Sequence, residues 1–575
     1  MADDPARSEH RFRASCASLD APVSPADEER LREYVDDLWE LADSIADVDH
    51  PGLRGVEGVL PRQYAWANTA GTLAPDAAPT TEPAADAAPP QTPATDASQP
   101  SAPAEPTQRH APGDLHRWSL AAVSDAIRTR RITPIELTEH LIARIQVLDP
   151  EVHSYVTLAD RQARTCAQQL TQEVDEGAWR GPLHGIPIGI KDSIPVAGMP
   201  CTGNSRLLED WIPRRDAEAV RRLLESGAVI LGKHNLNEFG WSLPSDADLM
   251  PPPRNPWFPS EPSVGSTSGG AAALTAQLCY AAIGTDGGGS VRLPAGQHLL
   301  VGIKPTHARV PRTGYGGGRV SDIGVLARSA HDAALVLAAL LQPLDDRASS
   351  ERADAIQQRA EAVTHAPRPL RFGLPRHYIN QVGMEDEVAV AFDRAVALCR
   401  SLGMEVVDMP PSALHNLAAG VKANFVVIAA EHHSAHRRTM TANPERYGAS
   451  ARFYNMPGAF LSAADYLNAL RVAEVVRSEV EDVMQTIDML VMPTSPVTRT
   501  SVARNAKTHR RGGNAAYTSP FNLTGHPAAS VPIGRSSEGI PIGLQLVGAY
   551  DSDFDILAAA HAITEAQDLP AYPVP

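Results

Sequence analysis

Short apolar runs alternate with helical patterns along most of the chain. Four of these runs have the length and composition of buried strands: GIPIGI from Gly185, AVILG from Ala228, MLVMP from Met489 and GLQLVG from Gly543. Strands that alternate with helices are typical of domains in which helices pack on a buried sheet. The pattern therefore predicts an α/β protein.

Helix starts can be located from capping residues. Ser119 is a suitable N-cap for a first helix. The segment Thr133-Pro-Ile-Glu136 is a capping box with proline at the first helical position, and it predicts a second helix that runs through Ile145. A further, alanine-rich helix is expected from Ala271.

The first 112 residues differ in composition from the rest. Residues 71–112 consist mainly of Ala, Pro, Thr, Asp and Ser, which predicts a disordered, semi-stiff linker. It separates a small helical segment, 1–70, from a large body, 113–575. Since one amphipathic helix does not fold alone, we expect the small segment to dock on the body in cis. Its helical spacing is carried by Leu31, Val35, Leu38 and Leu41.

Composition and charge narrow the class of protein. A hydrophobic content of 43% with 21% charged residues is typical of a soluble globular chain. The net charge of -17 argues against nucleic acid as a main partner. The N-terminus has no secretory pattern and the longest apolar stretch, 271–283, is too short to cross a membrane, so a cytoplasmic protein is expected. The five cysteines form no CxxC pair, which disfavours disulfides and structural zinc.

Three segments carry candidate chemistry. Lys191 ends the first apolar run; such a lysine is either an exposed strand end or a buried amine whose pKa is lowered enough for it to act as a base. GSTSGG at 265–270 is either a turn with a helix cap or a functional hydroxyl cluster. GTDGGGSVR at 284–292 is either a flexible loop or a nucleophile loop, whose glycines let successive N–H groups converge on an oxyanion beside Ser290.

Taken together, these segments resemble the amidase signature family. Lys191 and Ser266 are 75 residues apart (266 − 191), and Ser266 and Ser290 are 24 apart (290 − 266). The resemblance implies a large central, mostly mixed β-sheet flanked on both faces by helices. It is supported by further ordered motifs: RNPW at 254–257, GIKPT at 302–306, MPTSP at 492–496, PFNLTG at 520–525 and GLQLVG at 543–548.

The resemblance also implies a mechanism. Neutral Lys191 draws a proton through Ser266, which follows a cis peptide bond, and Ser266 deprotonates the nucleophile Ser290. The N–H groups of Gly287, Gly288 and Gly289, with that of Ser290, hold the oxyanion. An acyl-enzyme forms and water releases it, with no cofactor and no metal.

The chain departs from the family pattern at several positions. GSTSGG replaces GGSSGG, which makes Ser268 a rival of Ser266 and a candidate for substrate binding. Asp286 and Arg292 flank the nucleophile loop and are further candidates, either as substrate contacts or as a structural ion pair. Gly287 stands where threonine is usual, and the Gly-rich segment after Thr306 is expected to alter the pocket wall.

One histidine cluster has the look of a metal site. His432 and His436 lie at i, i+4 in EHHSAH, but the HExxH arrangement is absent. A helix surface without metal is therefore the expectation.

Residues 24–61 are similar in pattern to the small C subunit of the tRNA-dependent amidotransferases. Two functions follow from the resemblances. The leading expectation is an amidase that hydrolyses a small-molecule amide. The alternative is an A-type subunit of a glutamine-dependent aminoacyl-tRNA amidotransferase, fused to its C-type subunit, for which nucleic acid would be a partner. Assembly into a homodimer is left open.

Overall fold

The computed structural model describes residues 114–243, 248–341, 349–365, 369–499 and 513–573. All of them belong to one of the two units into which the chain divides. The small segment 1–70 and the linker 71–112 lie outside the described residues. The docking of that segment in cis and the boundaries of the linker therefore stay predictions.

A mixed sheet of eleven strands runs through the described part of the chain. The pairs β2–β3, β2–β6, β9–β10 and β9–β11 are parallel, and the other neighbours are antiparallel. All four apolar runs form strands, as predicted. In spatial order the strands are β1 (Tyr155–Leu158), β3 (Val229–His234), β2 (Pro187–Lys191), β6 (Ala281–Asp286), β8 (Asp322–Ala327), β7 (Val301–Lys304), β12 (Ala528–Arg535), β13 (Pro541–Gly548), β11 (Met489–Pro493), β9 (Arg371–Leu374) and β10 (Glu405–Asp408). A separate hairpin pairs β4 (Arg254–Asn255) with β5 (Phe258–Pro262).

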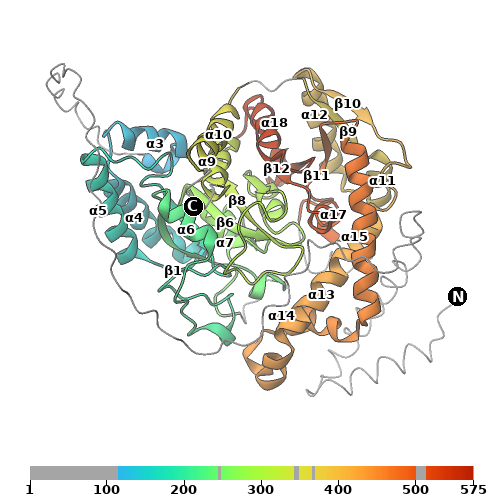
Figure 1. Cartoon of the computed structure of the whole chain (residues 1–575), viewed down its shortest axis with the longest axis horizontal. Helices are drawn as coiled ribbons and strands as arrows, with labels where there is room; N and C mark the ends of the chain where they lie inside the picture. The colour runs from blue at the N-terminus through green and yellow to red at the C-terminus, as the bar shows by residue number, and fades with distance from the viewer. Residues whose placement is uncertain (1–113, 244–247, 342–348, 366–368, 500–512, 574–575) are drawn as a thin grey trace, which may run out of the picture. The chain divides into compact units, whose positions relative to one another are not determined.

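Helices flank this sheet, so the predicted α/β class is confirmed (Figure 1). The α-helices are α3 (Leu120–Arg128), α4 (Pro134–Val152), α5 (Asp160–Asp175), α6 (Glu218–Glu225), α7 (Ser268–Thr275), α8 (Arg292–Gly296), α9 (Ala330–Leu341), α10 (Ser349–Ala362), α11 (Arg376–Val382), α12 (Asp386–Ser401), α13 (Leu417–Ala442), α14 (Ala449–Asn455), α15 (Ala463–Met484), α17 (Pro520–Thr524) and α18 (Asp553–Glu565). Helices α9 and α18 pack on β8 and β12, whereas α4 and α7 pack on β2 and β6.

The predicted helix caps are present. The Ser119 side chain accepts a hydrogen bond from the backbone of Ala122 at the start of α3. At the start of α4, Thr133 and Glu136 form the reciprocal capping box. Helix α4 extends to Val152, beyond the predicted end at Ile145. Among the helices that the structure describes, none is both long enough and apolar enough to cross a bilayer.

Small residues let α7 approach the sheet closely. A Cβ at Gly269 would lie 2.5 Å from the backbone nitrogen of Asn235, and one at Gly270 would lie 2.9 Å from Ala282 Cβ. Only glycine fits at such distances. The GG of GSTSGG therefore brings the serine-rich N-terminus of α7 against the strand that leads to Ser290.

The parallel order of β2 and β6 places their chemistry at one edge of the sheet. Ile190 of β2 lies in register with Ile283 of β6, so both strands end at the same side. Lys191 ends β2, and Thr285 and Asp286 end β6. Carboxyl ends of parallel strands are the usual place for a site in α/β folds.

Candidate active site

Lys191 is fully buried and hydrogen-bonded to two hydroxyl groups. Its Nζ lies 2.7 Å from Ser266 Oγ and 2.8 Å from Thr285 Oγ1. Burial lowers the pKa of Lys191 to about 7, and the nearby charge of Asp286 opposes that shift. The alternative of an exposed strand-end lysine is therefore wrong, and the amine can supply a neutral base near neutral pH.

Thr285 is a residue of this site that carries no signal of its own in the motifs. It lines the same cavity as the two serines and is the second hydroxyl bonded to the lysine amine. A signal was nevertheless available, because Thr285 is the penultimate residue of the strand that leads into the glycine-rich loop. In parallel strands that end together, a hydroxyl at this position faces the end of the neighbouring strand.

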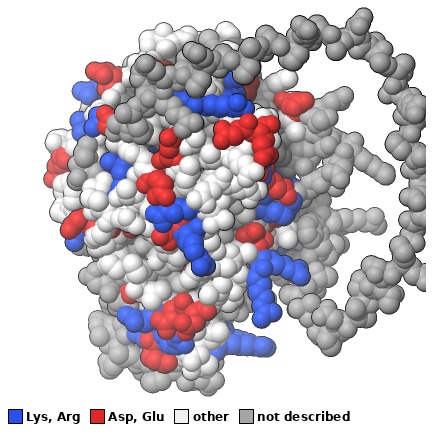
Figure 2. Space-filling view, turned by 90° about the vertical axis from the view of Figure 1, so that its left-hand side faces the viewer, with Lys and Arg blue, Asp and Glu red and all other residues white. Residues whose placement is uncertain are grey.

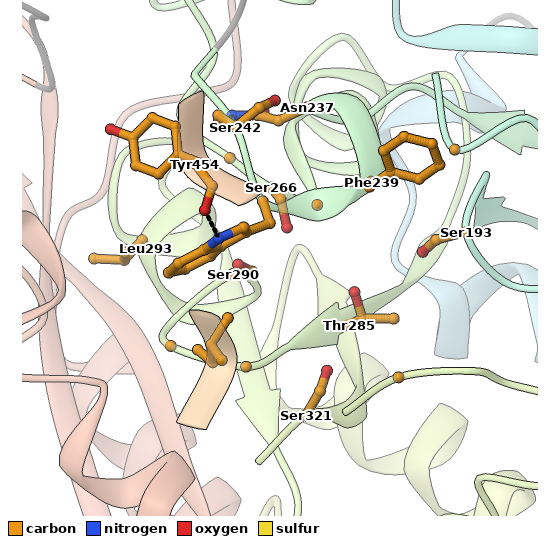
Figure 3. A pocket seen from close by; sticks show the side chains of 18 of the residues that line it. Ser193, Asn237, Phe239, Ser242, Ser266, Thr285, Ser290, Leu293, Ser321 and Tyr454 are labelled. Carbon is orange, nitrogen blue, oxygen red and sulfur yellow. Dashed lines mark hydrogen bonds between the residues drawn. The ribbon is translucent and has the colours of Figure 1, made fainter. Parts of the chain in front are cut away.

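Ser266 and Ser290 both line a cavity of about 770 Å³. Figure 3 shows them around the same part of the cavity as Thr285. The bond between Gly265 and Ser266 is a cis peptide. The backbone N–H of Thr267 donates to the carbonyl of Ser290 over 3.1 Å, which ties the two serine-bearing segments together.

Asp286 and Arg292 form a fully buried ion pair behind the nucleophile loop, with an N–O distance of 2.9 Å. Burial alone would raise the pKa of Asp286, but the charge and hydrogen bonds of Arg292 hold it well below its usual range. Arg292 also donates to Gln545 and to the carbonyl of Thr518. Of the two interpretations left open for this pair, its surroundings are those of a structural ion pair, because neither residue lines the cavity.

Ser268 lies in the first turn of α7 and is buried, and it does not line the cavity. Its hydroxyl has no hydrogen-bond partner in the structure. The lysine amine bonds the hydroxyl of Ser266 instead. Of the two serines in GSTSGG, the geometry thus favours Ser266 as the residue between Lys191 and the cavity.

The three glycines of the nucleophile loop are placed differently from one another. Gly287 and Gly288 line the cavity. The N–H of Gly289 instead donates to the Asp286 carboxylate over 2.7 Å. Among the described residues, the N–H groups of Gly287, Gly288 and Ser290 meet no acceptor, so these three are the donors available to an oxyanion.

The rest of the cavity wall is largely aromatic. The Trp241 ring lies 5.7 Å from both Phe425 and His432, and its Nε1 donates to the carbonyl of Tyr454 over 2.9 Å. Phe239 lies 4.3 Å from His436. These six lining residues are called the aromatic wall below: Phe239, Trp241, Phe425, His432, His436 and Tyr454.

His432 and His436 thus occupy a cavity wall, and the expectation of a helix surface is wrong. Their rings stack with centroids 5.9 Å apart. Burial lowers the pKa of His432 to about 3 and that of His436 to about 4, so both rings are neutral near pH 7. The described residues hold no group of three or more His, Cys, Asp or Glu side chains suited to a metal ion.

The Gly-rich segment after Thr306 contributes to the pocket wall, as expected. Residues 314–318 line the cavity, and Tyr315 OH lies 2.9 Å from Ser321 Oγ. The charged residues in the lining already have partners. Asp192 pairs with Lys233 over 3.0 Å, and Glu431 accepts from Tyr466 over 2.9 Å. Arg499 lies 3.7 Å from Glu261.

Charges of both signs alternate on the face that carries α3, α4 and α5. Figure 2 shows acidic and basic side chains interspersed there, with no single basic field. Ion pairs account for part of this pattern, including Arg128 with Asp125 and Arg164 with Glu139. Interspersed charges do not concentrate the positive potential that a nucleic-acid backbone requires.

Comparison with known proteins gives concordant matches. A family model described as Amidase matches residues 136–557. The glutamyl-tRNA(Gln) amidotransferase A subunit of Synechococcus sp. (strain CC9311) is 32% identical over 481 residues, which is 78% of this chain and 97% of that protein.

Solved structures match over a similar range. One described as "Crystal structure of amidase" has a TM-score of 0.69 at 29% identity, covering 78% of this chain and 99% of that one. Another, described as "An unexpected vestigial protein complex reveals the evolutionary origins of an s-triazine catabolic enzyme", has a TM-score of 0.72 at 25% identity, covering 79% of this chain and all of that one.

Proposed function

The chain belongs to the amidase signature family, whose members act on amide C–N bonds, and we propose that it cleaves such a bond with Ser290 as nucleophile. The observation that carries this proposal is the 2.7 Å contact between the buried Lys191 amine and Ser266 Oγ. A serine hydroxyl needs a base at neutral pH. A dry amine with a pKa of about 7 meets that need.

The proposed reaction moves one proton along the two serines. Lys191 Nζ takes the proton of Ser266 Oγ as Ser266 takes that of Ser290, and Ser290 Oγ bonds to the amide carbon. The N–H groups that face the cavity from the nucleophile loop stabilise the oxyanion. The C–N bond then breaks, and the proton returns through Ser266 to the departing nitrogen. Water attacks the acyl-enzyme by the same route and frees Ser290.

For the substrate, the curated relatives favour glutamine. The alignment with the Synechococcus protein spans 97% of its length, so the body of this chain corresponds to an entire A-type subunit. The C-subunit-like pattern of residues 24–61 points the same way. On this basis the leading interpretation is an A-type subunit that releases ammonia from glutamine for transfer to aminoacyl-tRNA, assisted by a fused C-type segment.

A second candidate is a hydrolase of small-molecule amides, and the aromatic wall favours it. Free glutamine carries an ammonium and a carboxylate, which bind best to charged side chains of opposite sign. In the described lining, the charged groups already have partners and the two histidines are neutral. Neutral aromatic walls instead suit planar, uncharged groups.

Release of ammonia from two amides decides between the candidates. The full chain would be assayed with L-glutamine and with benzamide, each with and without an added B-type subunit of a tRNA-dependent amidotransferase. Glutamine turnover that requires the B-type subunit supports the first candidate. Benzamide turnover that is unaffected by it supports the second. The Ser290→Ala variant is the control, and ammonia release by that variant would contradict the proposed nucleophile.

A further inference from the structure

The nucleophile loop between β6 and α8 is held by hydrogen bonds from several distant segments. Asn424 of α13 donates from Nδ2 to the carbonyl of Gly287 over 3.0 Å. Thr518, just before α17, donates to the carbonyl of Gly288 over 2.7 Å. The N–H of Leu293 donates to the carbonyl of Gly289 over 2.7 Å. A glycine-rich segment that would be mobile by itself is thereby fixed at consecutive carbonyls.

Planarity of the peptide bond converts these contacts into directions. The carbonyl of one residue and the N–H of the next lie in one plane and, in a trans peptide, point to opposite sides. The bond from Asn424 to the Gly287 carbonyl therefore sets the direction of the Gly288 N–H. In the same way the bond from Leu293 to the Gly289 carbonyl sets the direction of the Ser290 N–H.

The peptide unit between these two points the other way. Its carbonyl, on Gly288, is bonded by Thr518, and its N–H, on Gly289, is bonded to Asp286. This unit is held at both ends. The loop thus alternates: two units leave their N–H groups without an acceptor among the described residues, and the unit between them is saturated.

Asn424 is an unusual residue to find in this position. It is fully buried, it lines the cavity, and its Oδ1 has no hydrogen-bond partner. An orphaned buried acceptor costs about 1–3 kcal/mol. A leucine of similar volume would avoid that cost but would leave the Gly287 carbonyl without its donor.

We propose that Asn424 is a positioning residue that aims the Gly288 N–H at the oxyanion of the reaction. The inference rests on the proposed function, because it needs Ser290 to be the nucleophile. Asn424 acts on the transition state through the Gly288 peptide unit and does not touch the reacting atoms.

The test uses a fluorophosphonate probe, which needs no knowledge of the natural substrate. Ser290 Oγ bonds to phosphorus, the P–F bond breaks, fluoride leaves, and the serine proton passes through Ser266 to Lys191. The phosphoryl oxygen gains negative charge in this step and uses the same donors as an amide oxyanion. Labelling of the full chain gives a maximal rate, kinact, and a half-saturation concentration, KI.

The variants are Asn424→Leu and Asn424→Asp, both of which lack the donor. Removal of an entire oxyanion donor costs about 100- to 1000-fold. Because a misaimed donor retains part of its effect, we expect kinact to fall about 10- to 100-fold. KI should stay within about threefold, and the pH midpoint of labelling should not move. Asn424→Leu should keep or raise Tm, since it removes the orphaned oxygen.

Val427→Ala is the matched control. Val427 lies on the same helix and is equally buried, but it does not line the cavity. This change should lower Tm and leave kinact unchanged. If kinact stays within threefold of wild type in both Asn424 variants, the inference is wrong while the proposed function stands. If Ser290→Ala is still labelled, both are wrong.

Discussion

Raising the pH from 6 to 8 should increase kcat/KM about tenfold, with a plateau above pH 8. The reason is the Lys191 amine, whose pKa burial lowers to about 7. Only its neutral form accepts the proton from Ser266, so activity is present above that pKa and is lost as the pH falls through it. With a pKa of about 7, about one-eleventh of the amine is neutral at pH 6, about half at pH 7, and about ten-elevenths at pH 8.

An exposed lysine would behave differently. With its ordinary pKa of 10.5, the neutral fraction would rise about tenfold with each pH unit through 6, 7, 8 and 9, without a plateau. The assay is kcat/KM for a neutral amide, or the second-order rate of fluorophosphonate labelling, so that only the enzyme titrates. A rate that keeps rising tenfold per unit to pH 9 would refute the dry-amine argument. So would normal activity in Lys191→Ala, which we expect to be folded but nearly inactive.

Thr285→Val tests the same reasoning from the other side. The valine has the shape of threonine but lacks the hydroxyl that lies 2.8 Å from the lysine amine. Since that oxygen stabilises the charged form, its loss should lower the pKa of Lys191 further and move the break in the profile to lower pH. Thr285→Ser, which keeps a hydroxyl, should leave the break near that of the wild type. A break that moves upward in the valine variant would contradict this account.

Three further predictions concern the loop and the cavity. Ser290→Ala should reduce amide turnover and fluorophosphonate labelling to background while Tm changes little, because the nucleophile is lost and the fold is not. Gly289→Ala should destabilise the protein by about 1–3 kcal/mol in urea unfolding, because its φ is +124° and the new Cβ would lie 2.3 Å from Thr518 Oγ1. Gly539→Ala, with positive φ but open space around it, should cost less. Trp241→Ala should raise KM for benzamide more than it lowers kcat, and an unchanged KM would remove the aromatic wall from the account of specificity.

The sequence predicted the features that are set by local pattern. Apolar runs such as the one that ends at Lys191 form strands because their side chains are buried on both sides of the sheet. The capping box at Thr133 starts α4 because its hydrogen bonds are made within one turn. The three site residues were recognised because their spacing and glycine-rich context resemble a family.

What the sequence did not reveal depends on contacts between distant segments. Asn424 carries no motif and meets the nucleophile loop only because α13 packs beside it. His432 and His436 look like a helix surface along the chain, and the fold turns that surface into a cavity wall. The partners of Arg292 lie more than 200 residues away, so its environment could not be inferred from neighbouring positions.

The buried ion pair behind the nucleophile loop has a consequence for when the enzyme becomes active during synthesis. Arg292 takes its remaining partners from Thr518 and Gln545, near the carboxyl end of the chain. A nascent chain that ends before those residues can contain Lys191, Ser266 and Ser290 and still lack the groups that anchor their loop. Catalytic competence therefore arrives with the last strands to leave the ribosome, and a chain truncated in this region should be inactive even with its catalytic residues intact.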